Sequence, residues 1–333
     1  MAGIVMSHLI SVKLIIKIWV IGYADMKFTL RQLQVFVAVA QQESVSRAAD
    51  FLALSQSATS TSLSELERQS DCQLFDRAGK RLSLNALGLQ LLPQAVALLD
   101  QAKEIGQLLE GKSGFGSLNV GATLTVGNYL ATLLIGSFMQ RHPECRVKLQ
   151  VHNTAYVVQQ IAHYELDMGM IEGDCQHPDI EVQPWVKDEL VVFCAPQHPL
   201  AQRGEASLEE LTREAWILRE QGSGTRLTFD QAMRHHPGSL NVRLELEHTE
   251  AIKRAVESGL GIGCISRLAL RDAFRRGSLV ALETPELDLR RQFYFIWHKQ
   301  KYQTAAMREF IELCRALTAN VTRSDQIVLP TIA

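Results

Sequence analysis

The sequence predicts an α/β protein with an all-α N-terminal part. Three observations support this fold class. Three short helical patterns and a basic hairpin occupy residues 30–81, an apolar heptad pattern follows over residues 91–109, and helix and strand patterns alternate from residue 117 onward. Alternating helices and strands are typical of a parallel sheet, whereas short helices in succession form a separate helical unit. A chain of 333 residues has room for two or three such domains.

The N-terminal part contains three predicted helices. In the first, over residues 29–42, apolar residues recur at i, i+3, i+4 and i+7 and are Leu33, Phe36, Val37 and Ala40. A serine hydroxyl can accept from the unpaired N–H groups of a first helical turn. Ser46 is therefore the predicted N-cap of the second helix, whose inward residues are Ala48, Ala49 and Leu52. Ser55 is the predicted N-cap of the third helix, whose inward residues are Thr59, Leu63 and Leu66.

The outer face of the third helix is polar near its N-terminus. Its side chains are Gln56, Ser57, Ser60 and Thr61. Such groups donate and accept hydrogen bonds at base edges, and a helix N-terminus attracts phosphate. The alternative is a solvated face on an ordinary helical bundle.

A basic hairpin after this helix favours DNA binding. Residues 76–81, DRAGKR, place three cations around a glycine turn, and residues 82–84 alternate as a strand does. From residue 27 to residue 85 there are seven Lys or Arg and six Asp or Glu, a net charge of +1. Attraction to phosphate therefore depends on where the cations lie rather than on bulk charge. Three helices with a basic hairpin predict a winged helix-turn-helix.

The composition excludes several classes of protein. With 47% hydrophobic residues and a mean hydropathy near zero, the chain is predicted to be neither disordered nor a membrane protein. A formal net charge of −2 disfavours a nucleic-acid coater without sequence preference, because that class carries a broad basic excess. The six cysteines lie far apart without a CxxC pair, so neither a zinc site nor a disulfide framework is indicated. The expected compartment is the reducing cytoplasm.

Residues 1–25 do not fit this picture. They contain an apolar run over residues 14–21 that is interrupted by Lys17 and is too short to span a bilayer unaided. We interpret the segment as a mis-called start, with translation beginning at Met26. A disordered or membrane-touching extension is the alternative.

A heptad pattern follows the hairpin. The apolar residues are spaced by four and three in turn and are Leu91, Ala95, Leu98, Ala102, Ile105 and Leu109. This seam predicts a linker helix that pairs with a second copy of the chain, and a twofold protein would match a twofold operator. Pro93 predicts a bend or a late helix start. The alternative is a helix that packs on its own chain.

Residues 111–116, GKSGFG, predict a hinge. Strands are then expected at 118–121, 145–151 and 168–171, with helices at 126–140 and 155–163 between them. A second set of patterns contains strands at 189–194, 216–218, 244–247 and 262–265, a helix at 251–257, and a final helix at 304–317. Ser207 and Glu210 form a predicted capping box. Two α/β lobes joined by crossing strands would leave a ligand cleft beyond the strand ends.

Polar residues at strand-to-helix turns are the candidate lining of this cleft. One turn carries Thr123, Thr125 and Asn128, the next carries Asn153 and Thr154, and a third carries Ser223, Gly224 and Thr225. Hydroxyls and free N–H groups at a helix start suit a carboxylate or another oxyanion. Ordinary helix capping is the alternative for each turn alone, but three turns at corresponding sheet edges favour a pocket.

No enzyme site or cofactor site is indicated. His235 and His236 are adjacent and lack acidic or cysteine partners at metal-ligand spacing. Ser223 lies in a GSG run without a strand-bound GxSxG elbow or a histidine partner. We therefore expect no catalytic residues, no metal and no cofactor.

The two N-terminal motifs LRQLQVFVAVAQQESVSRAADFLALSQSA and LERQSDCQLFDRAGKRLSLNALG resemble the LysR-type bacterial transcriptional regulators, and the resemblance extends over residues 27–317. It implies that recognition-helix contacts fall on Gln56, Ser57, Ser60 and Thr61, and that wing contacts fall on Arg77 and Lys80. Many members have Pro at the position of Ser57 and Arg at that of Thr61. This chain therefore lacks one long cationic side chain that could contact a base.

The same resemblance implies a C-terminal effector domain like the periplasmic binding proteins, with its ligand between two lobes. Thr123, Thr125 and Thr225 fall on or beside positions where relatives bind their effector. Glu172 stands where relatives often carry a neutral residue and would oppose a second negative charge unless Arg226 or a proton compensates it. The blocks PWVKDELVVFCAP, AWILREQGSGTR and EAIKRAVESGLGIGCIS look similar to a YeiE-like subgroup linked to sulfur or sulfite responses.

We therefore predict a cytoplasmic regulator that binds operator double-stranded DNA, responds to a small anion such as a sulfur oxyanion, and forms a homodimer or homotetramer; contact with RNA polymerase stays open. The expected parts are an extension (1–25), a winged helix-turn-helix (26–85), a linker helix (86–112), a two-lobed effector domain (117–317) and a tail (318–333). A solute-binding protein without a DNA role is the main alternative, and a nucleoid-coating protein is the other.

Overall fold

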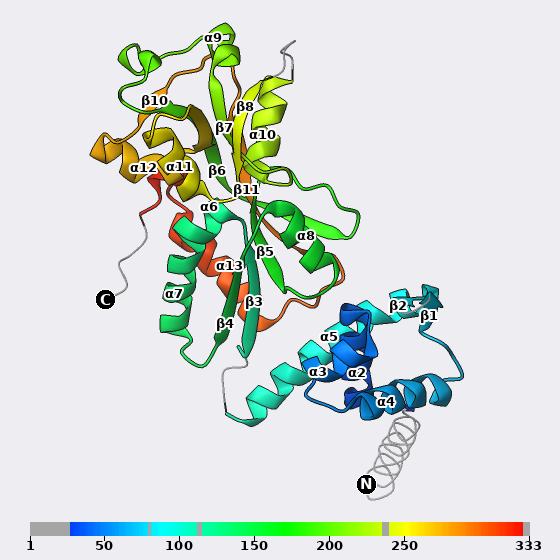
Figure 1. The fold of residues 1–333 in the computed structure, drawn as a ribbon. Coiled ribbons are helices and arrows are strands. Elements are labelled where there is room, and N and C mark those ends of the chain that lie inside the picture. The colour runs from blue at the N-terminus through cyan, green and yellow to red at the C-terminus, as the bar shows by residue number, and fades with distance from the viewer. Residues whose placement is uncertain (1–26, 79–80, 112–114, 235–239, 329–333) are drawn as a thin grey trace, which may run out of the picture. The chain divides into compact units, whose positions relative to one another are not determined.

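The computed structural model describes residues 27–78, 81–111, 115–234 and 240–328 (Figure 1). The predictions for residues 1–25, for Lys80, and for His235 and His236 lie outside these residues. The chain divides into two units, Met1–Leu99 and Asp100–Ala333. Across the described ranges, no helix is both long enough and apolar enough to cross a bilayer.

The N-terminal unit contains three short helices and a two-stranded hairpin. Their bounds are α2 (Leu30–Gln42), α3 (Val45–Phe51), α4 (Gln56–Gln69), β1 (Phe75–Ala78) and β2 (Arg81–Leu84). The helices enclose the predicted apolar residues, which are buried: Leu33, Phe36, Ala48, Ala49, Leu63 and Leu66. The rings of Phe36 and Phe75 meet edge to face with centroids 5.7 Å apart, so the hairpin packs on the first helix.

The helix starts confirm one predicted cap and correct another. Ser55 caps α4, because its hydroxyl accepts from the N–H of Ala58 at 3.2 Å. The prediction for Ser46 is wrong: Ser44 caps α3 and Ser46 lies within the helix. The cause is Glu43, whose left-handed backbone (φ 49°) ends α2 and lets the next helix begin two residues later.

A single long helix, α5 (Ala86–Leu109), follows the hairpin. The predicted late start at Pro93 is wrong, because α5 begins seven residues earlier and Pro93 lies inside it. The helix start is fixed by Asn85, whose side chain accepts from the N–H of Gly88 at 2.9 Å and donates to the carbonyl of Gln73 at 2.7 Å. Along the predicted seam, Ala95 is buried within the chain, whereas the exposed members are Leu98, Ile105 and Leu109.

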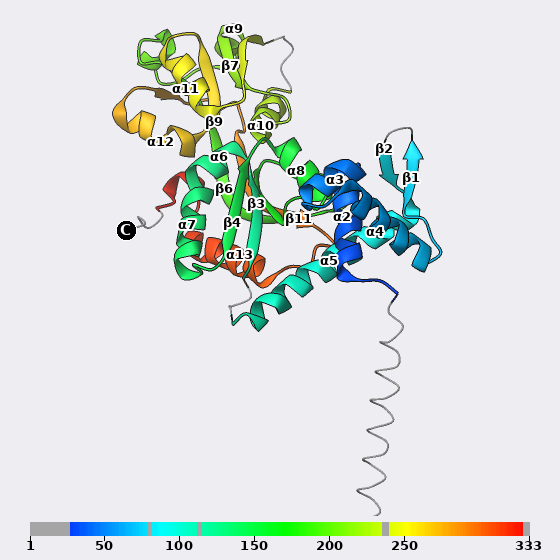
Figure 2. The same cartoon turned by 60° about the horizontal axis from the view of Figure 1, so that its bottom comes forward.

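The C-terminal unit begins with a first lobe, built on parallel strands β3 (Ser117–Ala122), β4 (Arg146–Val151) and β5 (Met168–Glu172). Its helices are α6 (Leu124–Val126), which continues through a π-helical turn (Gly127–Ala131) into α7 (Thr132–Arg141), then α8 (Thr154–Ala162) and α13 (Ala305–Thr318). Side chains that alternate along β3 separate the layers: Leu118, Val120 and Ala122 join the core with α7 and α13, and α8 covers the other face (Figure 2).

The second lobe is built on β7 (Ala215–Arg219), β8 (Asn241–Leu246) and β9 (Ile262–Ser266), which are parallel, with the short strand β10 (Val280–Leu282) beside them. Its helices are α9 (Leu208–Arg213), α10 (Gly224–Met233), α11 (Thr249–Glu257) and α12 (Arg267–Arg276). Trp216 and Leu218 pack with α9 and α10 on one face, and Ile217 packs with α11 and α12 on the other. The capping box of Ser207 and Glu210 at the start of α9 is confirmed.

Two long antiparallel strands, β6 (Ile180–Cys194) and β11 (Arg290–His298), run from one lobe to the other. The sheet order is β4-β3-β5-β11-β6-β9-β7-β8, so the two lobes share one continuous hydrogen-bonded path. The crossing strands were predicted, but β6 begins nine residues before the expected position 189 and β11 was not located. This arrangement matches the predicted two-lobed α/β effector domain.

The aromatic core of the N-terminal unit gives a first prediction. Phe36→Ala removes a fully buried ring and should lower the free energy of unfolding of that unit by about 3–5 kcal/mol. The matched control is Phe51→Ala, because Phe51 is 66% exposed on α3 and its loss should cost little. Amide hydrogen exchange of α2 and α4 in the full chain measures the change. Equal protection in the two variants would contradict the packing.

Candidate functional site

The polar residues predicted on the third helix lie at the start of α4 and face solvent. Gln56, Ser57, Ser60 and Thr61 are all exposed, whereas Thr59 between them is buried and donates to the carbonyl of Ser55 at 3.1 Å. The buried face of α4 is thus occupied by packing, and the N-terminal half of its outer face offers hydroxyl and amide groups for hydrogen bonds. This is the chemistry needed to contact base edges in a major groove.

The predicted wing is present as the β1–β2 hairpin. Arg77 lies on β1 opposite Leu82 on β2, and Phe75 lies opposite Leu84. The side chain of Arg77 and all of Lys80 are outside the described residues. The hairpin backbone supports a wing, and its cationic contacts stay a prediction.

In the first lobe, the cleft is bordered by the turns after β3 and β4. Thr123 and Thr125 are buried at the start of α6, and the Thr123 hydroxyl does not cap its own helix but points to the carbonyl of Met170 at 3.5 Å. Asn128 is exposed in the following turn. Asn153 caps α8 through the N–H of Tyr156 at 3.0 Å, which is the ordinary capping role.

The second lobe touches the first at the start of α10. The Gly224 N–H donates to Thr154 Oγ1 at 3.2 Å, and the N–H of Ala155 donates to the carbonyl of Gly222 at 3.2 Å. A Cβ at Gly224 would lie 1.9 Å from the carbonyl oxygen of Glu172. Glycine is therefore required here because two backbones meet with no room for a side chain. Ser223 caps α10 through the N–H of Arg226 at 3.4 Å.

A buried charge cluster lies beside this contact. Arg291, at the start of β11, donates through Nη2 to Glu172 at 2.7 Å and through Nε to Asp188 at 2.6 Å, and its Nη1 donates to the Thr225 hydroxyl at 3.0 Å. Burial acts to lower the pKa of Arg291, but the two carboxylates outweigh it and the pKa is raised. The cluster therefore joins Glu172 of the first lobe to Thr225 of the second through one permanently charged guanidinium.

Asp188 also accepts hydrogen bonds from two serine hydroxyls. Its carboxylate accepts from the Ser266 hydroxyl at 2.8 Å at the end of β9, and it also accepts from the Ser324 hydroxyl. All these groups are buried, and each oxygen of Asp188 has a partner. These pairings and hydrogen bonds offset the cost of burying the Asp188 carboxylate.

The structure corrects the expected partner of Glu172. Sequence reasoning gave that role to Arg226 or to a proton, but Arg226 pairs with Asp230 at 2.9 Å and with Glu245 at 2.7 Å, and Arg291 compensates Glu172. Sequence reasoning did not identify Arg291 or Asp188. The available signal was a run of charged residues before an apolar strand sequence, in RRQFYFIW and in KDELVVFC.

A groove of about 280 Å³ opens next to this contact between the lobes. Its lining comes from the end of β4 and from the turns and helices that follow β3, β4, β7 and β8: Leu124, Asn128, Val151, His152, Asn153, Tyr156, Glu220, Glu247 and His248. Asn128 and Asn153 were predicted to line the cleft. Glu220, Glu247 and His248 were not, although they follow strands in the same way as Asn153.

The groove is lined by both polar and apolar groups and is of the size of a small-molecule site rather than a peptide site. Glu220 is neutralised by Arg219, whose Nε lies 2.7 Å from its carboxylate. The His152 and Tyr156 rings stack with centroids 4.1 Å apart. Within the described ranges, no group of three or more His, Cys, Asp or Glu side chains is placed to hold a metal ion.

Comparison with protein families covers both units. The family described as "Bacterial regulatory helix-turn-helix protein, lysR family" matches residues 30–89, and the family described as "LysR substrate binding domain" matches residues 112–319. The first match contains the hairpin and α4, and the second contains both lobes and the groove.

Named relatives extend over almost the whole chain. An "Uncharacterized HTH-type transcriptional regulator YeiE" of Escherichia coli (strain K12) is 43% identical over 298 residues, which is 90% of this chain and 100% of that protein. The "RuBisCO operon transcriptional regulator" of Allochromatium vinosum is 33% identical, over 86% of this chain and 96% of that protein.

Two solved structures are similar as well. The Synechocystis CcmR regulatory domain in complex with 2-PG is 31% identical with a TM-score of 0.59, over 63% of this chain and 100% of that one. A full-length OxyR variant from Pseudomonas aeruginosa has a TM-score of 0.66 over 87% of this chain and 94% of that one; at 24% identity it shows the shared fold.

The backbone contact at Gly224 gives a second prediction. Gly224→Ala places a methyl group against the carbonyl of Glu172, and overpacking of this kind should lower the free energy of unfolding by about 1–3 kcal/mol. Gly106→Ala is the control, because no atom lies within 4 Å of a Cβ at this position in α5. Urea unfolding of the full chain measures both. If Gly224→Ala unfolds like the unsubstituted chain, the two lobes do not meet at Gly224 in solution.

Proposed function

Because the chain belongs to the LysR family of bacterial transcriptional regulators, we propose that its α4 helix reads operator DNA in the cytoplasm and that its interlobe cleft binds a small anion. The chain is a DNA-binding transcriptional regulator with an effector-binding domain, and not an enzyme, because its relatives are named as regulators. The alternative of a solute-binding protein leaves the helix-turn-helix match over residues 30–89 unexplained.

The observation that carries the DNA-binding proposal is the exposed polar N-terminal half of α4. We assign base contacts to Gln56, Ser57, Ser60 and Thr61, and phosphate contacts to Arg77 and Lys80 on the wing. Gln56 has the longest of the four side chains on α4 and can pair with adenine through two hydrogen bonds. The three hydroxyls accept and donate at shorter range. Base selection by α4 thus rests on hydrogen bonds from the Gln56 amide and the three hydroxyls rather than on a cationic side chain.

We assign the pairing of two copies of the chain to α5. Leu98, Ile105 and Leu109 are exposed on it at heptad-related positions, with Leu109 84% exposed. An exposed apolar row of this kind is stable in water when a second helix covers it. LysR regulators are typically oligomeric, which agrees with a homodimer or a homotetramer.

The anion proposal is supported by groups at the contact between the lobes. We assign anion contacts to Thr123, Thr125 and Thr225 and to the helix starts after Asn153 and Ser223, and the Thr225 hydroxyl lies 3.0 Å from Nη1 of Arg291. The CcmR regulatory domain is described in complex with 2-PG, which supports a small-molecule ligand for the corresponding domain of this chain. Sulfur oxyanions are the first candidates because the sequence resembles a YeiE-like subgroup linked to sulfur or sulfite responses.

Glu172 sets the condition for binding an anion. Glu172 and Asp188 together exceed the single charge of Arg291, so a second anion enters only when it replaces one carboxylate on the guanidinium. Glu172 is the group to be displaced, because Asp188 is also held by Ser266 and Ser324. The ligand would then occupy Nη2 of Arg291 while Thr225 stays on Nη1.

The DNA-binding proposal predicts two distinct losses. Gln56→Ala should relax the sequence preference by about 1–3 kcal/mol at one base pair, because a paired base contact is lost. Arg77→Ala should weaken all sites alike and reduce the salt slope by about one, because a phosphate contact is lost. Gel shifts over a range of salt concentrations measure both. Arg68→Ala, an equal loss of charge at the far end of α4, is the control. Unchanged binding in both test variants would refute this docking.

The effector proposal predicts a gain of affinity. Glu172→Gln removes the charge that competes with the ligand and should tighten binding of sulfite or sulfate about tenfold or more. Thermal-shift titration of the full chain with sulfite, sulfate, phosphate and acetate measures it, because a ligand of the native state raises its stability by mass action. Glu245→Gln is the control, because Glu245 is partly exposed and pairs with Arg226 outside the cluster. Weaker binding in Glu172→Gln would show that Glu172 holds the ligand.

A further inference from the structure

The last turns of α5 belong to the C-terminal unit and are tied to the first lobe by charge. Lys301 lies just after β11, and its Nζ is 2.7 Å from Asp100 of α5 and 2.8 Å from Asp167, the residue before β5. The Lys301 side chain is only 3% exposed. We call these three residues, together with Glu104, the Lys301 clamp.

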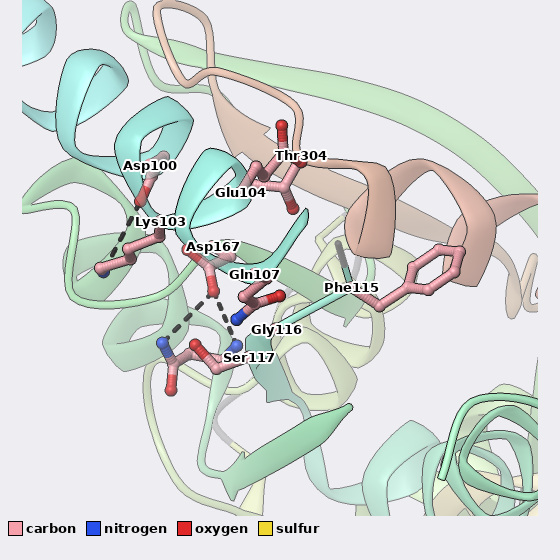
Figure 3. Close-up of a pocket in the computed structure, with 10 residues that line it drawn as sticks. Asp100, Lys103, Glu104, Gln107, Phe115, Gly116, Ser117, Asp167 and Thr304 are labelled. Atoms are coloured by element: carbon pink, nitrogen blue, oxygen red, sulfur yellow. Dashed lines mark hydrogen bonds and ion pairs between the residues drawn. The ribbon is translucent and has the colours of Figure 1, made fainter. Parts of the chain in front are cut away.

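Glu104 adds a second point of attachment, one helical turn after Asp100. Its carboxylate accepts from the Tyr302 hydroxyl at 2.9 Å and from the N–H of Ala305 at 2.6 Å. Ala305 is the first residue of α13, so a side chain of α5 satisfies an unpaired N–H at the start of another helix, where negative charge is favourable. Figure 3 shows Asp100 and Glu104 on this part of α5, with Asp167 and Thr304 beside them.

The clamp fixes one position of α5 on the lobe. Burial acts to lower the pKa of Lys301, but Asp167 and Asp100 outweigh burial and the pKa is raised, so the lysine stays charged. Asp167 is held in turn, because it accepts from the N–H of Asn119 at 2.7 Å. Sliding α5 by one turn would separate Asp100 from Lys301 and Glu104 from the N–H of Ala305, although Lys301 would keep its pair with Asp167. The clamp thus specifies the register of the linker helix.

The strands that carry the clamp also carry the charge cluster of the cleft. β5 and β11 are neighbours, with Glu172 opposite Phe293 and Gly169 opposite Ile296. At one end of this pair, Glu172 binds Arg291; at the other end, Asp167 binds Lys301. Five strand residues separate the two ion pairs by about 16 Å. β5 therefore has Glu172 at its end and Asp167 just before its start. β11 has Arg291 near its start and Lys301 just after its end.

We propose that β5 and β11 couple the buried Glu172–Arg291 pair between the two lobes to the Lys301 clamp on the linker helix. A ligand that displaces Glu172 from Arg291 then changes how firmly α5 is held on the first lobe. The regulatory use of this coupling rests on the function proposed above. The coupling itself is a property of the folded chain, and it is tested without DNA or ligand.

The experiment is a double-mutant cycle on the full chain with Asp100→Asn and Glu172→Gln, read by amide hydrogen exchange of residues 100–109. Asp100→Asn leaves Lys301 paired with Asp167, so the lobe keeps its own ion pair. It should raise exchange of residues 100–109 at least about fivefold, the lower end of a typical coupling between sites. Glu172→Gln should change exchange in the same segment although it lies at the far end of β5.

The double variant decides the proposal. When two distant sites are independent, the effects of their substitutions on the exchange rate multiply to within about twofold. We expect the exchange rates of the double variant to depart from the product of the single effects by more than threefold. Lys103→Gln is the control, because Lys103 is an exposed neighbour of Asp100 on the same helix, and it should leave the exchange unchanged. Protection of β9 at its original level shows that Asp100→Asn does not unfold the second lobe.

Two results would overturn the proposal. Unchanged exchange in Asp100→Asn would mean that the clamp does not hold α5. If the exchange rate of the double variant equals the product of the two single effects to within twofold, the clamp anchors α5 independently of the Glu172–Arg291 pair. If Asp100→Asn unfolds the unit, Glu104→Gln replaces it in the cycle, since it removes the attachment to Ala305 and leaves the lysine pairs intact. None of these results depends on whether the effector is an anion.

Discussion

The burial of Arg291 between two carboxylates is the interaction on which the C-terminal unit depends. A guanidinium cannot lose its proton in a protein, so once it is buried its charge must be met by fixed partners. Glu172, Asp188 and Thr225 come from different elements, and all three must be in place at once. The close backbone contact of Gly224 with Glu172 follows from this demand, because it brings α10 to the end of β5. In the proposed function, an anion that enters between the lobes competes with Glu172 for this guanidinium.

Local patterns predicted the helices well and the long strands poorly. The apolar residues of α2 and α4 repeat with the helical period, and the burial of Phe36 and Leu63 follows from that repeat alone. The start of α3 depended on the left-handed backbone of Glu43, for which the sequence carries no strong signal. The first part of β6 reads IEVQPWVKD, where polar residues and a proline hide a strand that is held by pairing with β11. Pairing of distant segments is a tertiary effect that overrides local propensity.

The candidate cleft residues were predicted from one rule, and the rule explains what was missed. Parallel strands end at the same edge of a sheet, so Thr123, Asn153 and Thr225 were expected together. An antiparallel strand begins at the edge where its parallel neighbour ends. Arg291 enters the site in this way, at the start of β11 beside the end of β5. Because the direction of β11 is set by its neighbours in the folded sheet, reading strand ends from the sequence could not find it.

The low charge of the N-terminal unit gives the linker helix its importance. With a net charge of +1 over residues 27–85, one copy has little bulk charge to attract phosphate, and its binding depends on local cations. In the proposed pairing of two copies through α5, the second contact would be intramolecular, and affinity would depend on how well the spacing of the two copies matches the operator. The end of α5 is held by Asp100 and Glu104 on the lobe that contains Glu172. Under the proposed coupling, a small ligand would change that hold and thereby the spacing of the two DNA contacts, without touching the α4 helix.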